Sequence, residues 1–396
     1  MPLPDVLIKK GRGGLGRQKP TDDGISGLLT QGVAVAGKLA LNTNYELRSI
    51  QAAEALGILA TGTYATTHYH IGEYFRMSPG AILIVRVVAQ TVPMVDMLDR
   101  TLTHAKSMLV AGNGRIKQLG VALNPAAGYA PSFTSGFDDD VFAAIDKAQA
   151  LAAEEFTQHR PVVILLAGHG YAGFANDIVN LRAQDAELVS VVLGTDFLKQ
   201  PDEPALGTLL GTVSASAVHE NVGWVGKFNL ASDGYFLQAG LSDGKALSAL
   251  VPGDVEALHE RGYVLALQHA GVDGNYWNDS HTCTGLDNDY AYIENVRTIN
   301  KACTITRRAL LPSLKGPLPL TATGALRPAV VASLEASIKT AIEAGMLRAG
   351  EISDLDVYID PDQNVQSTSK VEVKLNLISV ATGRLLEATV GFVQSL

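Results

Sequence analysis

The sequence predicts a layered α/β body followed by a carboxy-terminal α+β domain with two helices, an antiparallel β-meander and extended terminal arms. From about Leu28 to about Val264, short β-type runs alternate with amphipathic helical stretches, which is typical of α/β layers. After Tyr292, two helical patterns precede three runs of alternating residues. At 396 residues and 47% hydrophobic content, the chain has room for two domains or one elaborated domain.

Hydrophobic runs predict the elements of the first region. The expected buried strands are residues 81–89, 116–123, 161–168 and 187–194. Helical stretches lie between them at residues 93–110 and 137–156. Asp138, Asp139 and Asp140 open the second stretch, where carboxylates favour the positive end of a helix dipole.

The last hundred residues follow a different pattern. Val296, Ile299, Cys303, Thr306 and Leu310 recur at helical spacing, which predicts one mostly apolar stripe where Cys303 acts as an inert small hydrophobe. Pro312 ends this helix, and a second one begins at Arg327-Pro328 and runs to about Arg348. Alternating runs then predict strands at residues 354–360, 370–377 and 385–392. In the last run, one face carries Leu386, Ala388, Val390 and Phe392.

Composition excludes several classes. A net charge of −9 argues against a broad nucleic-acid-binding face. A membrane span is not predicted, because the sequence contains no run of about eighteen uncharged apolar residues. The first five residues lack the regions of a signal peptide, so we expect synthesis in the cytoplasm. Only Cys283 and Cys303 are present, which argues against a disulfide framework and a structural zinc site.

The glycine motif from Gly168 to Gly173 is the strongest catalytic candidate. Gly168, Gly170 and Gly173 form G-x-G-x-x-G after an expected strand, and Asp196 ends the next strand. Glycines at a helix amino terminus let a pyrophosphate approach the backbone, and the acid binds a ribose hydroxyl. An NAD(P)-dependent oxidoreductase is therefore the alternative hypothesis, although a tight turn explains the glycines equally well.

Two further motifs are better explained without chemistry. Residues 32–39 match a phosphate loop, but Leu39 replaces its magnesium-binding hydroxyl and residues 33–36 look like a strand. His68 and His70 would share a face only on a strand. No third ligand lies near them in the sequence, so we expect ordinary polar histidines near a helix start. No serine or cysteine nucleophile signature is present.

The window from Gly274 to Tyr292 is rich in polar residues. Asp279, His281, Cys283, Asp287 and Asp289 crowd into it, but we expect helix capping by Thr284, Asp287 and Asp289 in place of metal binding. Tyr276 and Trp277 are expected to anchor the loop through buried aromatic area.

The amino-terminal segment predicts an arm. Val6, Leu7 and Ile8 form a short strand candidate. The following residues 9–19 contain five basic residues and four glycines, a composition typical of a flexible tether. An aromatic residue for nucleic-acid stacking is missing from this tether.

The chain resembles contractile-tail sheath proteins of phage tails, tailocins and related contractile injection systems. Residues 275–312, the second helix and the short meander carry most of the resemblance, and residues 52–58, 70–87 and 220–230 agree with it. The resemblance implies a non-catalytic subunit with no cofactor. Such subunits form six-fold rings stacked around an inner tube and exchange terminal strands with their neighbours.

The resemblance also sets expectations for organisation and partners. We expect an arm (1–22), an α/β body (23–273) and a carboxy-terminal sheath domain (274–396). The partners it implies are further copies of the chain, the inner tail tube protein, and the baseplate and tail terminator proteins. The particle would be a virion tail or other contractile particle assembled in the bacterial cytoplasm. The expected inter-subunit arm residues are Val6, Leu7, Ile8, Leu386, Ala388, Val390 and Phe392.

Overall fold

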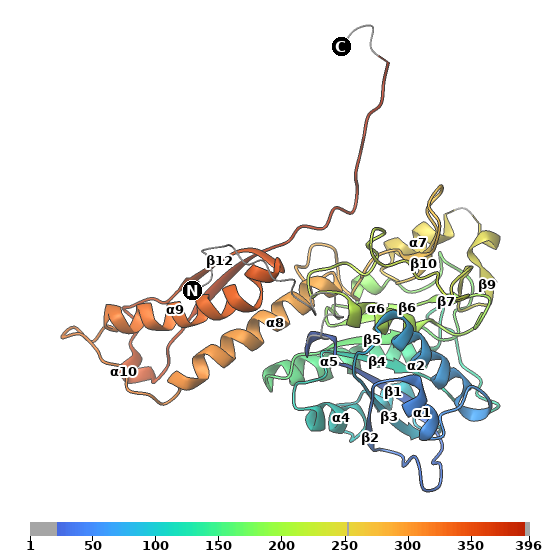
Figure 1. The fold of residues 1–396 in the computed structure, drawn as a ribbon, viewed down its shortest axis with the longest axis horizontal. Helices are drawn as coiled ribbons and strands as arrows, with labels where there is room; N and C mark the ends of the chain where they lie inside the picture. Colours follow the sequence, from blue (N-terminus) through green and yellow to red (C-terminus); the bar gives the residue numbers. More distant parts are fainter. Residues whose placement is uncertain (1–21, 252, 393–396) are drawn as a thin grey trace, which may run out of the picture.

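A six-stranded sheet forms the centre of the larger part of the protein (Figure 1). The computed structural model describes residues 22–251 and 253–392. In spatial order the strands are β2 (Asn44–Leu47), β3 (Leu83–Ala89), β1 (Ser26–Gly32), β4 (Gln118–Ala122), β5 (Val163–Ala167) and β6 (Val189–Val192). The last five run parallel, and β2 pairs antiparallel with β3.

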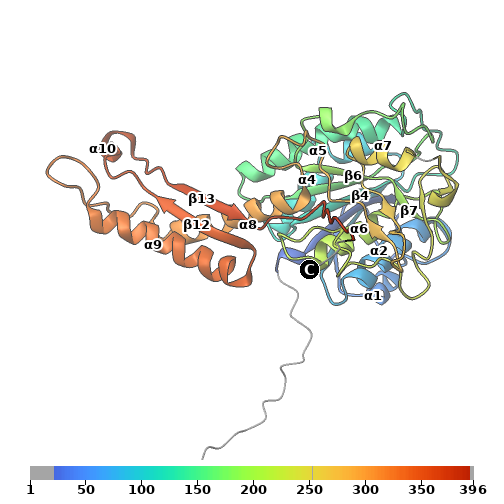
Figure 2. The ribbon, with the colours of Figure 1, turned by 90° about the horizontal axis from the view of Figure 1, so that it is seen from above.

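Helices cover both faces of this sheet (Figure 2). On one face lie α3 (Met94–Met97), α4 (Ala105–Gly112), α5 (Asp139–Thr157) and α7 (Asp254–Glu260). On the other lie α1 (Ile50–Ala55), α2 (Ala65–Met77) and α6 (Leu206–Ala215). Successive strand residues alternate between the two cores, as Leu165 and Leu166 do on β5. Parallel strands are buried on both faces, which explains their continuous hydrophobic runs.

Two glycines allow α6 to pack closely against α2. A Cβ atom on Gly207 would lie 2.2 Å from the His70 carbonyl oxygen, and one on Gly211 would lie 2.8 Å from the Tyr74 carbonyl oxygen. These distances are shorter than any van der Waals contact, so the absence of a side chain sets the spacing of the two helices.

Smaller elements complete the body. Three short strands form a second sheet: β7 (Gly194–Asp196), β8 (Ala239–Leu241) and β9 (Lys245–Ala246). Two more, β10 (Ala266–Leu267) and β11 (Tyr276–Trp277), pair antiparallel. The short 3₁₀ turns are Asp22–Gly24, Gly62–Tyr64, Leu181–Ala183, Leu247–Ala249, Leu311–Ser313 and Leu347–Ala349.

A narrow lobe projects from one side of the body (Figures 1 and 2). It contains α9 (Pro328–Gly345), α10 (Val365–Thr368) and the antiparallel pair β12 (Ile352–Tyr358) and β13 (Lys374–Ser379). The helix α8 (Ile293–Leu310) joins the two parts. Its residues Ile293 and Val296 lie in the body core, and Ala302 lies in the lobe core. The passage from body to lobe therefore falls within one helix.

Most predicted elements are present, with three corrections. The predicted helix at residues 93–110 is two helices, α3 and α4, separated by turns. Residues 33–36 are not a strand, because β1 ends at Gly32 and Val35 forms only an isolated bridge to Leu39. The predicted strand at residues 385–392 is absent from the described chain, so the meander is a two-stranded hairpin.

Candidate interaction surface

The β12–β13 hairpin presents unpaired edges. Leu355 lies opposite Leu377 and Val357 opposite Leu375, and these residues pack against the helices of the lobe. Within the described part of the chain no third strand joins this sheet. Both outer edges therefore keep backbone N–H and C=O groups available for another strand.

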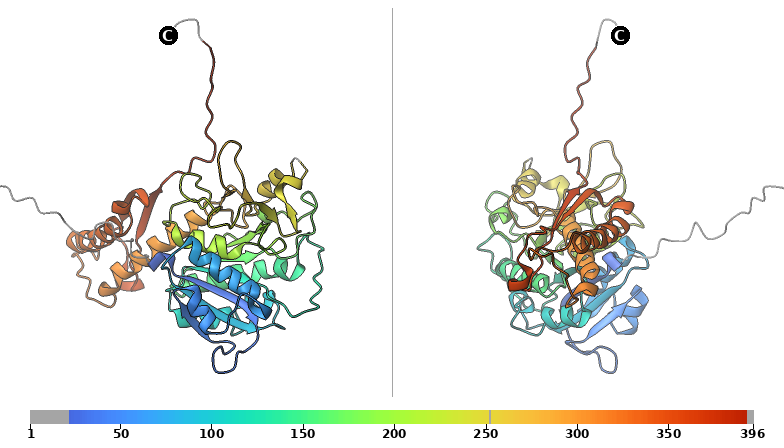
Figure 3. Two further views of the ribbon diagram at one scale, coloured as in Figure 1. Left: turned by 45° about the vertical axis from the view of Figure 1, so that its right-hand side comes forward. Right: turned by 90° about the vertical axis from the view of Figure 1, so that its left-hand side faces the viewer.

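The segment that follows β13 leaves the molecule as an extended chain (Figures 1 and 3). Leu386 is 89% exposed, Val390 is 94% exposed, and Ala388 and Phe392 are exposed as well. The structure thus brings none of these four predicted arm residues against this chain. Val6, Leu7 and Ile8 lie outside the described residues.

A groove of about 880 Å³ lies between α8, β13 and the body. Its apolar wall includes Ile299 and Leu310 from α8 and Leu375 and Leu377 from β13. The strand β13 therefore lines the groove and is also an edge strand of the two-stranded lobe sheet. A strand added at that edge would place one of its faces over these apolar side chains.

Arg384 fixes the extended segment to the body at its root. Its Nε donates to Asp279 Oδ2 at 2.8 Å, and a guanidinium nitrogen donates to Glu294 Oε1 at 2.6 Å. Its guanidinium carbon lies 3.4 Å from the centroid of the Tyr292 ring, a cation–π contact. Asn221 donates to both carboxylates.

Burial and charge shift the pKa values of the two carboxyl groups in opposite directions. Burial raises the pKa of Asp279, but the charge and hydrogen bond of Arg384 and the hydrogen bond of Asn221 outweigh it and hold that pKa below its usual value. Burial raises the pKa of Glu294 above its usual value, although Ser280 and Arg384 oppose the shift. Among the described residues, Arg384 is the cation that forms an ion pair with both buried acids.

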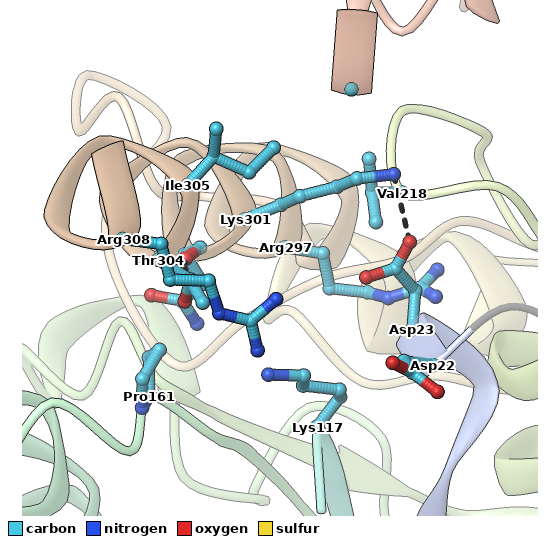
Figure 4. Close-up of a pocket in the computed structure, with 12 residues that line it drawn as sticks. Asp22, Asp23, Lys117, Pro161, Val218, Arg297, Lys301, Thr304, Ile305 and Arg308 are labelled. Carbon is cyan, nitrogen blue, oxygen red and sulfur yellow. Dashed lines mark hydrogen bonds and ion pairs between the residues drawn. The ribbon is translucent and has the colours of Figure 1, made fainter. Parts of the chain in front are cut away.

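Lys301 lies on the same face of α8 as Glu294, near the middle of the helix, and joins three parts of the chain. Its Nζ lies 2.8 Å from Asp23 Oδ2 and 2.6 Å from Glu351 Oε2. Figure 4 shows Lys301 and Asp23 at the side of a pocket of about 200 Å³. Asp23 precedes β1 and Glu351 precedes β12. One ammonium group therefore ties the start of the body, α8 and the lobe together.

The glycine motif does not form a dinucleotide site. After β5 the chain from Gly168 to Asn180 is irregular, and the next helical turn is only Leu181–Ala183. A pyrophosphate would have no helix amino terminus to bind. Asp196 is buried and accepts from the Phe236 N–H at 2.7 Å, so its carboxylate is engaged away from any ribose.

Histidines of the two dismissed motifs meet at a buried acid. Glu203 Oε1 lies 3.0 Å from His70 Nε2, and Glu203 Oε2 lies 3.6 Å from His169 Nδ1. Burial lowers the pKa of His169, but the nearby carboxylate of Glu203 outweighs it and raises that pKa above its usual value. His68 instead contacts Glu54 at 3.0 Å. Across residues 22–251 and 253–392, no cluster of three ligand-type side chains suits a metal ion.

The window from Gly274 to Tyr292 is a structured entry to α8, but not through the predicted caps. Tyr292 is the N-cap and no side chain caps that end. Asp287 and Asp289 are exposed, and Thr284 accepts from the Asn288 side chain instead. The aromatic anchor is confirmed by Trp277, which is 1% exposed in the body core.

Two further residues of this window are buried and neutral, and one prediction on α8 is corrected. Burial lowers the pKa of His281 to about 3 and raises that of Cys283 well above its usual value, so both are neutral. Cys303 is exposed, so its prediction as a buried stripe residue is wrong. The buried face of α8 instead includes Val296, Asn300 and Ala302.

The fold is that of contractile sheath proteins. The anti-feeding prophage helical sheath in its contracted state is 12% identical, with full coverage of both chains and a TM-score of 0.61. The sheath of an extracellular contractile injection system, named PVC, is 12% identical over 100% of this chain and 98% of that chain (TM-score 0.57). A sheath tail protein from Desulfitobacterium hafniense is 9% identical over 95% of this chain and all of its own (TM-score 0.51).

Family models identify the chain itself. The DUF2586 N-terminal domain matches residues 3–281, and the DUF2586 C-terminal domain matches residues 289–396. The chain belongs to the DUF2586 family. The predicted membership of the sheath fold family is therefore confirmed. No curated protein matches the sequence.

Sequence reasoning missed the residues that hold the extended segment and the start of the body. Glu294 and Lys301 are seven positions apart, which places two opposite charges on one helix face. Arg384 is a single basic residue directly before an alternating apolar run. That charge pattern was visible in the sequence, but the partners of each residue were not.

Proposed function

We propose that this chain is the structural subunit of a contractile tail sheath. Subunits would polymerise as stacked hexameric rings around an inner tube and contract to drive the tube through a target envelope. The observation that carries this proposal is the exposed alternating segment at residues 385–392 beside a two-stranded sheet with open edges. The sheath fold supports it.

Strand addition explains what the exposed segment does. Leu386, Ala388, Val390 and Phe392 of one subunit would form one face of a strand paired with the hairpin of a neighbour. That face would cover the apolar groove beside Leu375 and Leu377, while the main chain gains the hydrogen bonds of the ladder. Such a head-to-tail contact does not close on itself and so propagates a helical array.

The amino-terminal arm supplies the second link in this proposal. Val6, Leu7 and Ile8 would add a strand to another neighbour through the glycine-rich tether of residues 9–19. Linked by two arms, rigid bodies would rotate outwards from a metastable extended lattice into a wider, shorter one. A few kcal/mol per subunit are sufficient when many coupled subunits change state together.

The remaining expectations form part of the same proposal. The partners are other copies of the chain, the inner tail tube, and the baseplate and terminator proteins. The helix from Pro328 to Arg348 is our candidate for the tube-facing element. The subunit is non-catalytic, and it belongs to a virion tail or other contractile particle assembled in the bacterial cytoplasm.

We retain the division into residues 1–22, 23–273 and 274–396. Among the described residues, every helix is too short or too polar to cross a membrane.

Deletion of Met1 to Lys19 tests the function. The truncated subunit should melt like the full chain but fail to form tubes when produced together with the neighbouring gene products. Negative-stain electron microscopy and sedimentation give the readout. Full-length tubes made by the truncated subunit would refute the role of the amino-terminal arm, and the absence of tubes from the intact chain would refute the sheath function.

A further inference from the structure

Both arm roots are attached to the same face of α8. Glu294 contacts Arg384, which lies directly before the exposed segment. Lys301 contacts Asp23, which lies directly before β1. Positions seven apart on a helix are two turns apart on one face, a separation of roughly 10 Å. A single rigid element therefore sets the distance between the two roots.

The contact at Arg384 is built to stay closed. The side chains of Asp279 and Glu294 are only 7% and 3% exposed. Departure of Arg384 would leave two buried carboxylates without their cation, which is strongly unfavourable. The Tyr292 ring packs against the Arg384 guanidinium group. The Asn221 side chain donates a hydrogen bond to the Asp279 carboxylate.

The contact at Lys301 is also one cation between two carboxylates, but here α8 supplies the cation. The side chains of Lys301, Asp23 and Glu351 are 16%, 17% and 8% exposed. Two carboxylates from different parts of the chain share one ammonium group, and Figure 4 shows Lys301 reaching across the pocket wall to Asp23. Loss of the lysine would leave like charges close together in a poorly solvated place.

We propose that these two ion-pair clips on α8 fix the positions of Asp23 and Arg384, the two points from which the terminal arms leave the folded part of the subunit. Arg384 and Lys301 are positioning residues in this proposal, which rests on the sheath function proposed above. The two arm roots then keep a fixed separation, because both are attached to one helix.

The test uses full-length variants that open a clip without leaving a buried charge. The triple variant Asp279→Asn, Glu294→Gln and Arg384→Met opens the first clip. The triple variant Asp23→Asn, Lys301→Met and Glu351→Gln opens the second. Lys38→Met, an exposed basic position on the body and outside the groove, is the control for removal of a surface charge.

Spin labels report the geometry of the roots in the unassembled subunit. The exposed native Cys303 carries one label, and the other is placed at Leu385→Cys for the first clip or Asp22→Cys for the second. We expect a narrow distance distribution in the intact chain and in the control. Opening a clip should broaden the distribution at its own root only. Unchanged distributions would overturn the proposal.

Assembly provides the second readout. Clip-opened variants whose melting temperature stays within a few degrees of the intact chain should form no tubes, or short irregular ones. Normal tubes from these variants, when the intact chain also forms tubes, would overturn the link between the clips and assembly but leave the sheath function standing. If the intact chain forms no tubes, the sheath function fails, and the distance measurements still decide whether the clips position the roots.

Discussion

Face-specific substitution in the exposed segment tests strand addition most sharply. Leu386→Ser combined with Val390→Ser removes two apolar side chains from one face of the proposed strand. Both are almost fully exposed in the single chain, at 89% and 94%, so the folded subunit should lose no stability. The change should appear only on assembly.

The expected magnitude follows from the buried area. Full burial of a leucine or valine side chain contributes about 1.5 to 3 kcal/mol, so the pair contributes about 3 to 6 kcal/mol per contact. Since each 1.4 kcal/mol is tenfold, the concentration needed for polymerisation should rise by roughly two to four orders of magnitude. Sedimentation of a dilution series measures this threshold.

A matched control lies one position away. Leu385 is 84% exposed and would face the opposite side of the added strand, away from the groove. Leu385→Ser should shift the threshold by less than tenfold. Equal effects of the two changes would show that the segment acts through general hydrophobicity, and polymerisation of the double variant at the normal threshold would refute strand addition at this groove.

Three further predictions concern the body and its titratable groups. Gly207→Ala should lower the free energy of unfolding by about 1 to 3 kcal/mol through overpacking against α2. Gly72→Ala on α2, where the new Cβ atom would meet nothing closer than 4.0 Å, should raise that free energy by up to about 1 kcal/mol. Thermal melts compare the two variants. Because the pKa of His169 is raised, its pairing with Glu203 stabilises the fold below the usual histidine pKa, and this stabilisation is lost as pH rises through the folded-state pKa. His169→Asn should therefore lower the melting temperature more at pH 6 than at pH 9. An equal loss at both pH values would contradict the pairing. A thiol reagent should titrate Cys303 in the native subunit and Cys283 only after unfolding; fast native reaction of both would contradict the burial of Cys283.

Local signals in the sequence predicted the parts of the fold that local forces determine. Asp138 does cap α5, since its side chain accepts from the Asp140 N–H, and Pro328 does open α9. Residues 93–110 were misjudged because helical spacing continues across the turns between α3 and α4. Nothing in the pattern indicates where such a helix breaks.

Long-range pairing could not be predicted from the sequence. Glu203 meets His70 across 133 positions, and Arg384 meets Asp279 across 105. The run at residues 385–392 has the period of a strand, which shows that one face is suited to burial. Periodicity does not identify the surface against which this face is buried. The run was therefore predicted as a third strand of the meander in the same chain, whereas the described residues offer it no partner strand.

The span of α8 across both cores makes it a lever arm. Eighteen residues extend roughly 27 Å, with one end embedded in the body and the other in the lobe. A 10° tilt of the body-embedded end would displace the far end by about 5 Å, close to the spacing of neighbouring strands. A tilt of that size would carry the hairpin out of register with any strand held in place by a neighbour. In the proposed sheath, larger rotations of the body would therefore have to be taken up by the extended connections between subunits, and the length of those connections would set the stroke.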